Sequence, residues 1–334
     1  MDTPDASRPF PQIAISFAPA WWLAHYGRAP DGQAKARLLY ERFGDVGLGE
    51  PDPAPPEPCV GGEYGDRFMS AFWGCEIAYQ EGQFPAAIPL PDARRRMEGL
   101  QLPEIATSPV AQRAFADAEA LRVQHGRCSA AVNYGGPLNN AVSVFGQEIL
   151  GVCAGEPDLA RRVLQLMGEA VLLVHDEIVC PINGVDPADT RAGGWGIGNC
   201  PVCAISPATY RDVVRPSDLW LVGQFAGGFG LHHCGVFDAY AEGYKALSPV
   251  ALDLGPGSDL RIARAAYPEA AISTYLEVGA VARMTRREVD AAVARLVSDA
   301  GDTGSFTVIS VAEAGPELSD ATVRDLMTVR ERIA

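Results

Sequence analysis

The alternation of short apolar runs with helix-like segments after about residue 105 is the feature that most constrains the fold of this chain. The segment from residue 156 opens with Glu156-Pro157-Asp158, an acid and a proline in the first turn, and its apolar residues then recur at helical spacing. Strands that alternate with helices favour parallel βαβ units. The pattern therefore predicts an α/β protein built on a parallel sheet.

The expected elements follow one another closely along the chain. We expect strands over residues 193–197, 219–222, 250–254, 271–274 and 305–311, and helices over residues 109–124, 156–179, 207–218, 236–247, 257–267, 285–299 and 319–332. There are at least five such units, and we find neither a glycine-rich dinucleotide fingerprint nor a phosphate loop. These observations favour a (β/α)8 TIM barrel over an open doubly wound sheet.

The first 105 residues differ because they are rich in Pro and Gly and carry aromatic patches. Residues 51–58 read PDPAPPEP, which excludes a helix or a central strand there. We expect residues 1–334 to form a single barrel domain. Its loop-rich N-terminal segment and first barrel elements would occupy residues 1–105, and the main barrel units residues 106–334.

Charge and cysteine usage narrow the class of protein. The formal net charge of −15 argues against a nucleic-acid or anionic-membrane partner. No stretch has the pattern of a secretory signal or the length of a transmembrane helix. Without an export signal, the eight cysteines are expected to be reduced thiols or metal ligands rather than disulfides. We therefore expect a cytoplasmic protein.

The segment His232-His233-Cys234-Gly235 carries the strongest chemical signal. On an extended backbone, residues two positions apart point the same way, so His232 and Cys234 can reach one metal ion. Imidazole and thiolate together suit zinc. His233 is expected to face the other way and to serve in packing or in supporting a ligand. The alternative without a metal is a core histidine that packs beside a buried cysteine.

Two further segments follow predicted strands, where functional groups of a parallel barrel collect. Cys200-Pro201-Val202-Cys203 comes after the strand expected at 193–197, and Glu313 comes after the one at 305–311. The third ligand stays open between Glu313 and one thiol of the Cys200/Cys203 pair. If both thiols join, the site is closed and structural. Alternatively, the Cys200/Cys203 pair is a redox pair or two packed thiols.

At these residues the chain resembles the uroporphyrinogen decarboxylase superfamily, and specifically its zinc-dependent corrinoid:thiol methyltransferase branch. That branch carries an H-x-C-G segment of zinc ligands, which residues 232–235 match. The likeness covers most of the chain, through the order and spacing of several segments. These are Phe72-Trp73-Gly74-Cys75-Glu76, Gly135-Gly136-Pro137-Leu138-Asn139-Asn140-Ala141 and Ile205-Ser206-Pro207-Ala208-Thr209-Tyr210-Arg211.

The resemblance implies an enzyme in which zinc activates a thiol that exchanges a methyl group with the cobalt of a corrinoid, carried by a partner protein. Transfer in the reverse direction, from a methylated substrate onto cobalt, would use the same site. Candidate substrate-shaping residues are His25, Tyr64, Glu76, Tyr134 and Asn139. The five cysteines elsewhere are expected to be ordinary thiols: Cys59, Cys75, Cys128, Cys153 and Cys180.

Two departures from the superfamily matter. The decarboxylases hold porphyrin carboxylates with arginines in an M-R-Q-A-G-R stretch, and Ala24 stands here in place of the first arginine. Porphyrinogen decarboxylation is therefore disfavoured, although a decarboxylase-like, metal-free lyase stays an alternative. The methyltransferases also have a distal cysteine as third zinc ligand, whereas this chain has none after Cys234. A structural zinc site without methyl transfer is the other alternative.

Overall fold

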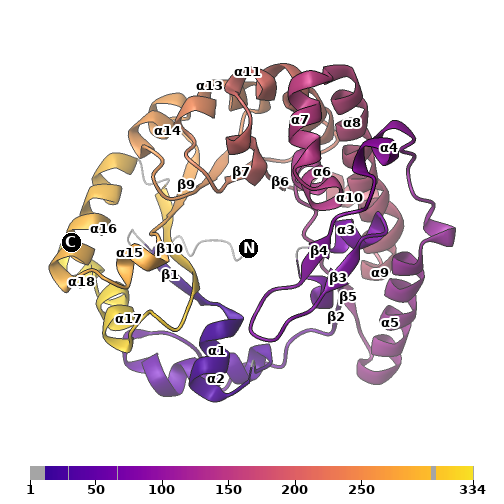
Figure 1. Cartoon of the computed structure of the whole chain (residues 1–334). Coiled ribbons are helices and arrows are strands. Elements are labelled where there is room, and N and C mark those ends of the chain that lie inside the picture. The colour runs from indigo at the N-terminus through magenta and orange to yellow at the C-terminus, as the bar shows by residue number, and fades with distance from the viewer. Residues whose placement is uncertain (1–11, 29, 66, 302–305, 334) are drawn as a thin grey trace.

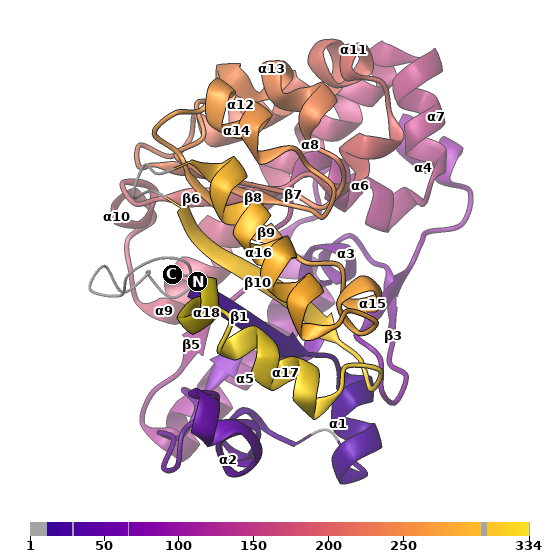
Figure 2. The same ribbon diagram turned by 90° about the vertical axis from the view of Figure 1, so that its left-hand side faces the viewer.

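The protein is described by a computed structural model covering residues 12–28, 30–65, 67–301 and 306–333. The chain runs once around a ring, with strands toward the inside and helices mostly outside (Figure 1). In the side view the long C-terminal strands slope across the molecule behind the helices that cover them (Figure 2). This arrangement is the α/β class that the alternating pattern predicts.

Six strands form one parallel sheet. Their order is β1 (Gln12–Phe17), β10 (Phe306–Ala314), β9 (Ala271–Tyr275), β8 (Ala251–Leu254), β7 (Phe229–His233) and β6 (Trp195–Gly198). A separate parallel pair consists of β2 (Cys59–Val60) and β5 (Ser129–Ala130). Strands β3 (Glu76–Ala78) and β4 (Ala86–Ile88) make an antiparallel hairpin. Among the described residues, no strand pairing joins the β2–β5 pair to the six-stranded sheet.

Helices fill the intervals between the strands. The helices up to β6 are α1 (Pro19–Tyr26), α2 (Gly32–Phe43), α3 (Phe68–Phe72), α4 (Ala93–Glu98), α5 (Pro109–His125), α6 (Pro137–Phe145), α7 (Glu148–Gly155), α8 (Pro157–Val174), α9 (Cys180–Asn183) and α10 (Pro187–Arg191). After β6 come α11 (Pro207–Thr209), α12 (Arg215–Val222), α13 (Ala241–Tyr244), α14 (Leu260–Ala266), α15 (Val278–Val281), α16 (Arg286–Ala300), α17 (Asp320–Met327) and α18 (Arg330–Ile333). Two π-helical segments, His175–Val179 and Tyr210–Val214, continue α8 and α11.

The two faces of the six-stranded sheet differ sharply in composition. On β8, Leu252 and Leu254 are buried, whereas Ala251 and Asp253 on the other face are partly exposed. The same alternation recurs on β7, and the buried face packs in the hydrophobic core. Because burying a leucine stabilises a fold by roughly 1.5–3 kcal/mol, this face anchors the sheet. The other face is thereby left free for polar side chains.

One predicted strand is wrong. Residues 219–222 are apolar but form the last turn of α12, where Asp218 and Leu221 are buried on the same helix. The strand lies instead at β7, where Phe229, Leu231 and His233 alternate with Gly230 and His232. The neighbouring glycines lower the β-propensity of this stretch, and they hid its period-two pattern.

Most other expected elements are confirmed with shifted ends. The helix expected over 236–247 is divided into α13 and two short 3₁₀ turns, Asp238–Tyr240 and Lys245–Leu247. Residues 51–58 contain no helix or strand, as the prolines predict. The strand expected over 305–311 corresponds to β10, although Ser305 lies outside the described residues. In the part of the chain that the structure describes, no helix is both long and apolar enough to cross a membrane.

Candidate metal centre

The centre lies where β6 and β7 end beside each other. The two strands are parallel, and Gly198 pairs with His232. The chain leaves β6 through Asn199, whose backbone N–H donates to the His232 carbonyl at 2.8 Å, and turns into the 3₁₀ segment Cys200–Ala204. Cys234 follows directly after β7. Since parallel strands end at the same edge of a sheet, Cys200 and Cys234 are brought face to face.

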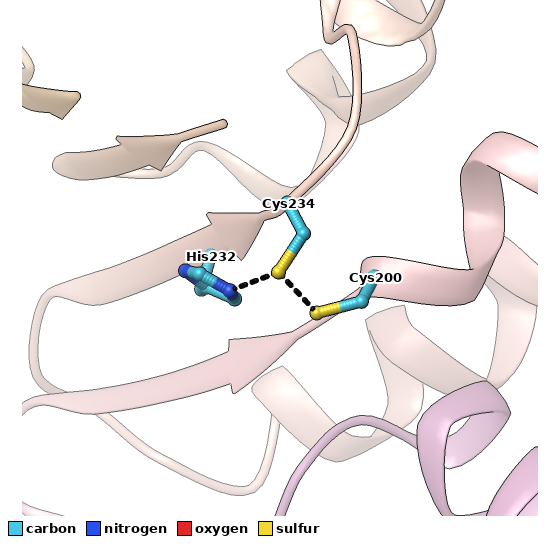
Figure 3. A group of neighbouring side chains, drawn as sticks. All are labelled: Cys200, His232 and Cys234. Atoms are coloured by element: carbon cyan, nitrogen blue, oxygen red, sulfur yellow. Dashed lines mark hydrogen bonds between the residues drawn. The ribbon is translucent and has the colours of Figure 1, made fainter. Parts of the chain in front are cut away.

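Three side chains that could hold a metal ion, Cys200, His232 and Cys234, converge at this edge (Figure 3). His232 Nε2 lies 2.7 Å from Cys234 Sγ, and Cys234 Sγ lies 2.9 Å from Cys200 Sγ. One donor atom from each of the three residues lies within 4.8 Å of the others. Two sulfurs and one imidazole nitrogen form a donor set that fits zinc.

Asp253 on β8 orients the histidine. His232 Nδ1 lies 2.6 Å from Asp253 Oδ2, and the hydroxyls of Ser273 and Tyr275 each donate to the same carboxylate at 2.5 Å. A carboxylate that holds Nδ1 fixes the tautomer in which Nε2 is free to bind a metal. Sequence reasoning missed Asp253. The available signal was an acidic residue inside the otherwise apolar strand expected at 250–254.

The charges of the three donors depend on one another. Contact with the Cys234 thiol, together with His232 and Asn139, lowers the pKa of Cys200 to about 4, although burial opposes this change. Burial alone would lower the pKa of His232, but Asp253 and Cys200 together raise it to about 10. The Cys200 thiolate and burial raise the pKa of Cys234. These shifts favour one negative charge on the two facing sulfurs, next to the His232 ring.

Gly255 fixes the backbone at Cys234. Its N–H donates to the His233 carbonyl at 2.7 Å, and a Cβ at this position would lie 1.7 Å from the Cys234 carbonyl oxygen. No other residue type fits this close approach. His233 itself is buried and faces away from His232, with Nδ1 3.1 Å from the Tyr244 hydroxyl. The prediction that His233 serves in packing is confirmed.

A buried carboxyl supports the corner that carries Cys200. The Asn199 amide donates to Asp218 Oδ2 at 2.7 Å, and the Tyr210 hydroxyl donates to the same oxygen at 3.2 Å. Asn199 and Asp218 are fully buried. Burial raises the pKa of Asp218 to about 7, while its two donors oppose the rise. This contact holds α12 against the end of β6.

The other proposed ligands lie beside the three donors or apart from them. Cys203 is exposed, and its Sγ donates to the Cys200 carbonyl at 3.1 Å rather than pointing at a sulfur. Glu313 is exposed near the end of β10, has φ of 57°, and its N–H donates to Ser16 Oγ at 3.0 Å. Within the described ranges, neither residue belongs to the group of three converging donors.

The predicted substrate residues are spread more widely. Asn139, in the first turn of α6, lies close enough to Cys200 to help lower the pKa of that thiol. His25 stacks on Trp21, with Nδ1 2.8 Å from the Trp21 carbonyl oxygen. Tyr64 packs edge-on against Phe68. Glu76 begins β3 with an exposed side chain.

Tyr134 lies in a different cluster, around His175. Its ring is 4.8 Å from that of Trp195 and 6.1 Å from that of His175. His175 is buried, with Nδ1 2.8 Å from Asp176 Oδ1 and Nε2 3.2 Å from Thr190 Oγ1. This His175 cluster also contains Cys180, whose Sγ is 3.4 Å from Thr190 Oγ1. The eight cysteines are all free thiols.

Comparison with known proteins supplies a fold but no family. No protein-family model matches the chain, and no curated protein sequence matches it. Among solved structures, the chain is similar to a methyltransferase from Methanosarcina mazei, with a TM-score of 0.60 and 13% sequence identity. The match covers 98% of this chain and 96% of that chain. The two proteins therefore share an overall fold along nearly their whole length.

Proposed function

We propose that this chain is a zinc-dependent methyltransferase that moves a methyl group between a corrinoid cobalt, carried by a partner protein, and a thiol or other small-molecule substrate. The observation that carries the proposal is the convergence of Cys200, His232 and Cys234. Three protein ligands would leave one position of a tetrahedral zinc ion for a substrate. The fold likeness to a methyltransferase supports this reaction class.

In this proposal, Cys200 takes the place of the distal cysteine of the related methyltransferases. It reaches the centre from the end of β6 instead of from the last strand. Asp253 keeps His232 Nε2 directed at the sulfurs, and Asn139 helps to lower the pKa of Cys200. When bound, zinc would supply the Lewis acidity that lowers the pKa of a substrate thiol and makes it nucleophilic at neutral pH.

We also infer that β1, β2 and β5 to β10 are the eight strands of a (β/α)8 barrel, in which β3 and β4 form an added hairpin. The parallel β2–β5 pair and the circular path of the chain in Figure 1 support this inference. The centre would then lie at the carboxyl ends of the fourth and fifth barrel strands, the end where barrel enzymes place their active sites.

Metal analysis tests the proposal first. Protein purified in reducing buffer should retain close to one zinc per chain, and the His232→Ala variant should lose it. The Cys203→Ser variant should retain zinc, because Cys203 Sγ is turned toward a carbonyl oxygen. If Cys203→Ser also lost the metal, a closed structural site would be favoured. A wild-type protein without stoichiometric zinc would refute thiol activation.

A methyl-transfer assay tests the reaction itself. Zinc-loaded protein should consume free methylcobalamin in the presence of at least one member of a thiol panel. The Asn139→Ala variant should be slower at equal zinc content, because Cys200 loses a polar neighbour that lowers its pKa. The same assay, applied to alanine variants, can rank the contributions of the other predicted site residues, which stay predictions: His25, Tyr64, Glu76, Tyr134 and Glu313. Absence of transfer by a zinc-replete protein with every thiol would favour the structural alternative.

A further inference from the structure

The facing sulfurs of Cys200 and Cys234 have a chemistry of their own besides metal binding. They approach to 2.9 Å from two separate loops, and Figure 3 shows each side chain directed at the other. A disulfide bond requires about 2.05 Å between sulfurs, so closing this gap needs a shift of less than about 1 Å. The backbone at Cys234 is held by Gly255, so rotation of the two side chains and movement at Cys200 would supply the shift.

The solvent exposure of the thiols and the contacts of Cys203 both favour a bond between Cys200 and Cys234. Cys234 is exposed and Cys200 is half-buried, so a small oxidant can reach both, whereas Cys75, Cys153 and Cys180 are buried. Cys59 and Cys128 are also half-buried, but their sulfurs donate to backbone carbonyls at 3.4 Å and 3.2 Å. The C-x-x-C spacing of Cys200 and Cys203 would suggest that these two thiols form the redox pair. In the structure, however, Cys203 Sγ is engaged with the Cys200 carbonyl at 3.1 Å, and the sulfur that meets Cys200 is that of Cys234.

We propose that Cys200 and Cys234 form a redox-modification site, at which a peroxide converts the metal-binding pair into an inter-loop disulfide. The two thiols lose two electrons and two protons, and one S–S bond forms. The O–O bond of hydrogen peroxide breaks, and the peroxide is reduced to two water molecules. Because a disulfide no longer offers thiolate ligands, oxidation and metal binding exclude each other.

The effect of this disulfide on activity rests on the proposed function. A zinc-dependent enzyme would be switched off by oxidation and restored by a dithiol and zinc. Zinc bound to both sulfurs should in turn slow their oxidation. The site would thus restrict activity to reducing conditions. The pairing itself depends only on the geometry of the two loops.

Hydrogen peroxide treatment of zinc-loaded full-length protein tests the inference. Zinc release is followed with a chromogenic chelator, free thiols are alkylated, and linked peptides are identified by mass spectrometry. We expect one disulfide between Cys200 and Cys234 for each zinc released, and recovery of zinc binding after dithiothreitol and added zinc. The Cys203→Ser variant is the matched control and should behave as the wild type does.

Three results would overturn the inference: a Cys200–Cys203 disulfide, oxygenated sulfurs without a disulfide, or full zinc retention with no linked peptide. Protein stripped of metal before oxidation separates this inference from the proposed function. If the reduced protein contains no zinc but still forms the Cys200–Cys234 bond, the proposed function fails and the redox pair stands. If the reduced protein holds zinc but these cysteines never link, the redox pair fails alone.

Discussion

Two histidine–cysteine clusters in this protein use the same side chains in opposite ways. In the His175 cluster, both ring nitrogens have protein partners, Asp176 and Thr190, and Cys180 contacts the same threonine hydroxyl. In the candidate metal centre, Nδ1 of His232 is held by Asp253, whereas Nε2 faces two sulfurs and lies 2.7 Å from Cys234 Sγ. A cluster whose donors are all satisfied internally is a packing unit. Donors that converge on one accessible point are instead arranged for a ligand from outside.

The pKa values of the two histidines also distinguish the two clusters. Burial, aided by Arg191, lowers the pKa of His175, which therefore stays neutral. At His232, Asp253 and the Cys200 thiolate overcome the effect of burial and raise the pKa to about 10. One ring is held as a neutral hydrogen-bonding group. The other ring has a raised pKa, so a metal ion that bound at Nε2 would have to displace a proton.

Removing a converging donor should have the largest effect. The Cys200→Ser variant should bind zinc on the order of a thousandfold more weakly than the wild type, because a thiolate ligand is lost. Chelator competition at pH 7.5 measures the change. The matched substitution in the packing cluster, Cys180→Ser, should leave zinc affinity unchanged. Equal zinc loss in both variants would erase the distinction between the clusters.

The pH dependence of zinc binding should be the next largest effect. Because the pKa of His232 is raised to about 10 without metal, its proton must leave when Nε2 binds zinc. Apparent affinity should therefore rise about tenfold per pH unit, or about a hundredfold between pH 6 and pH 8, for each proton displaced. The same competition assay across pH measures it. An affinity independent of pH would contradict the proposed ligand state.

The His175→Ala substitution should affect stability and spare the metal. We expect the free energy of unfolding to fall by about 2 kcal/mol, because buried partners of the ring are left unsatisfied. Since the pKa of His175 is lowered in the folded state, its contribution is present above the ordinary histidine pKa and is lost as the pH falls. Urea unfolding at pH 7.5 and pH 5.5 checks both effects. Reduced zinc content in folded variant protein would show that the clusters are coupled.

An effect of similar size, on zinc binding, is expected at the carboxylate behind His232. The Asp253→Asn variant should retain its fold but bind zinc roughly ten- to a hundredfold more weakly, because the charge that supports the histidine is lost. Ser273→Ala, which removes only one hydrogen bond to Asp253, is the control and should cost less. Identical affinities for wild type and Asp253→Asn would mean that Asp253 does not tune the metal.

The fold class could be predicted because helical periodicity and apolar runs are local signals. Helix α16 follows its Thr285 capping box, and α5 begins at the predicted residue. The error at residues 219–222 arose because four apolar residues fit a strand and a buried helical turn equally well. Strand β7 was obscured because glycine and histidine carry little β-propensity.

The site could be predicted only where its residues are close in sequence. His232 and Cys234 are two positions apart, so an extended backbone was enough to bring them together. Cys200 entered as one of several candidate ligands, because the pairing of β6 with β7 cannot be read from spacing. Asp253 was missed for the same reason. It reaches His232 through strand pairing across twenty-one positions, and one acidic residue in an apolar strand gave no hint of that partner.

The close approach of Gly255 to Cys234 makes position 255 important for the candidate metal centre. Gly255 has no side chain, yet it determines the position of the Cys234 sulfur. Only a hydrogen atom fits between the two backbone segments at this point. In a saturation mutagenesis experiment selected for zinc retention, position 255 would be as intolerant as the ligands themselves. A search for catalytic residues by mutational sensitivity would therefore find a glycine there, whose whole contribution is the space that it leaves empty.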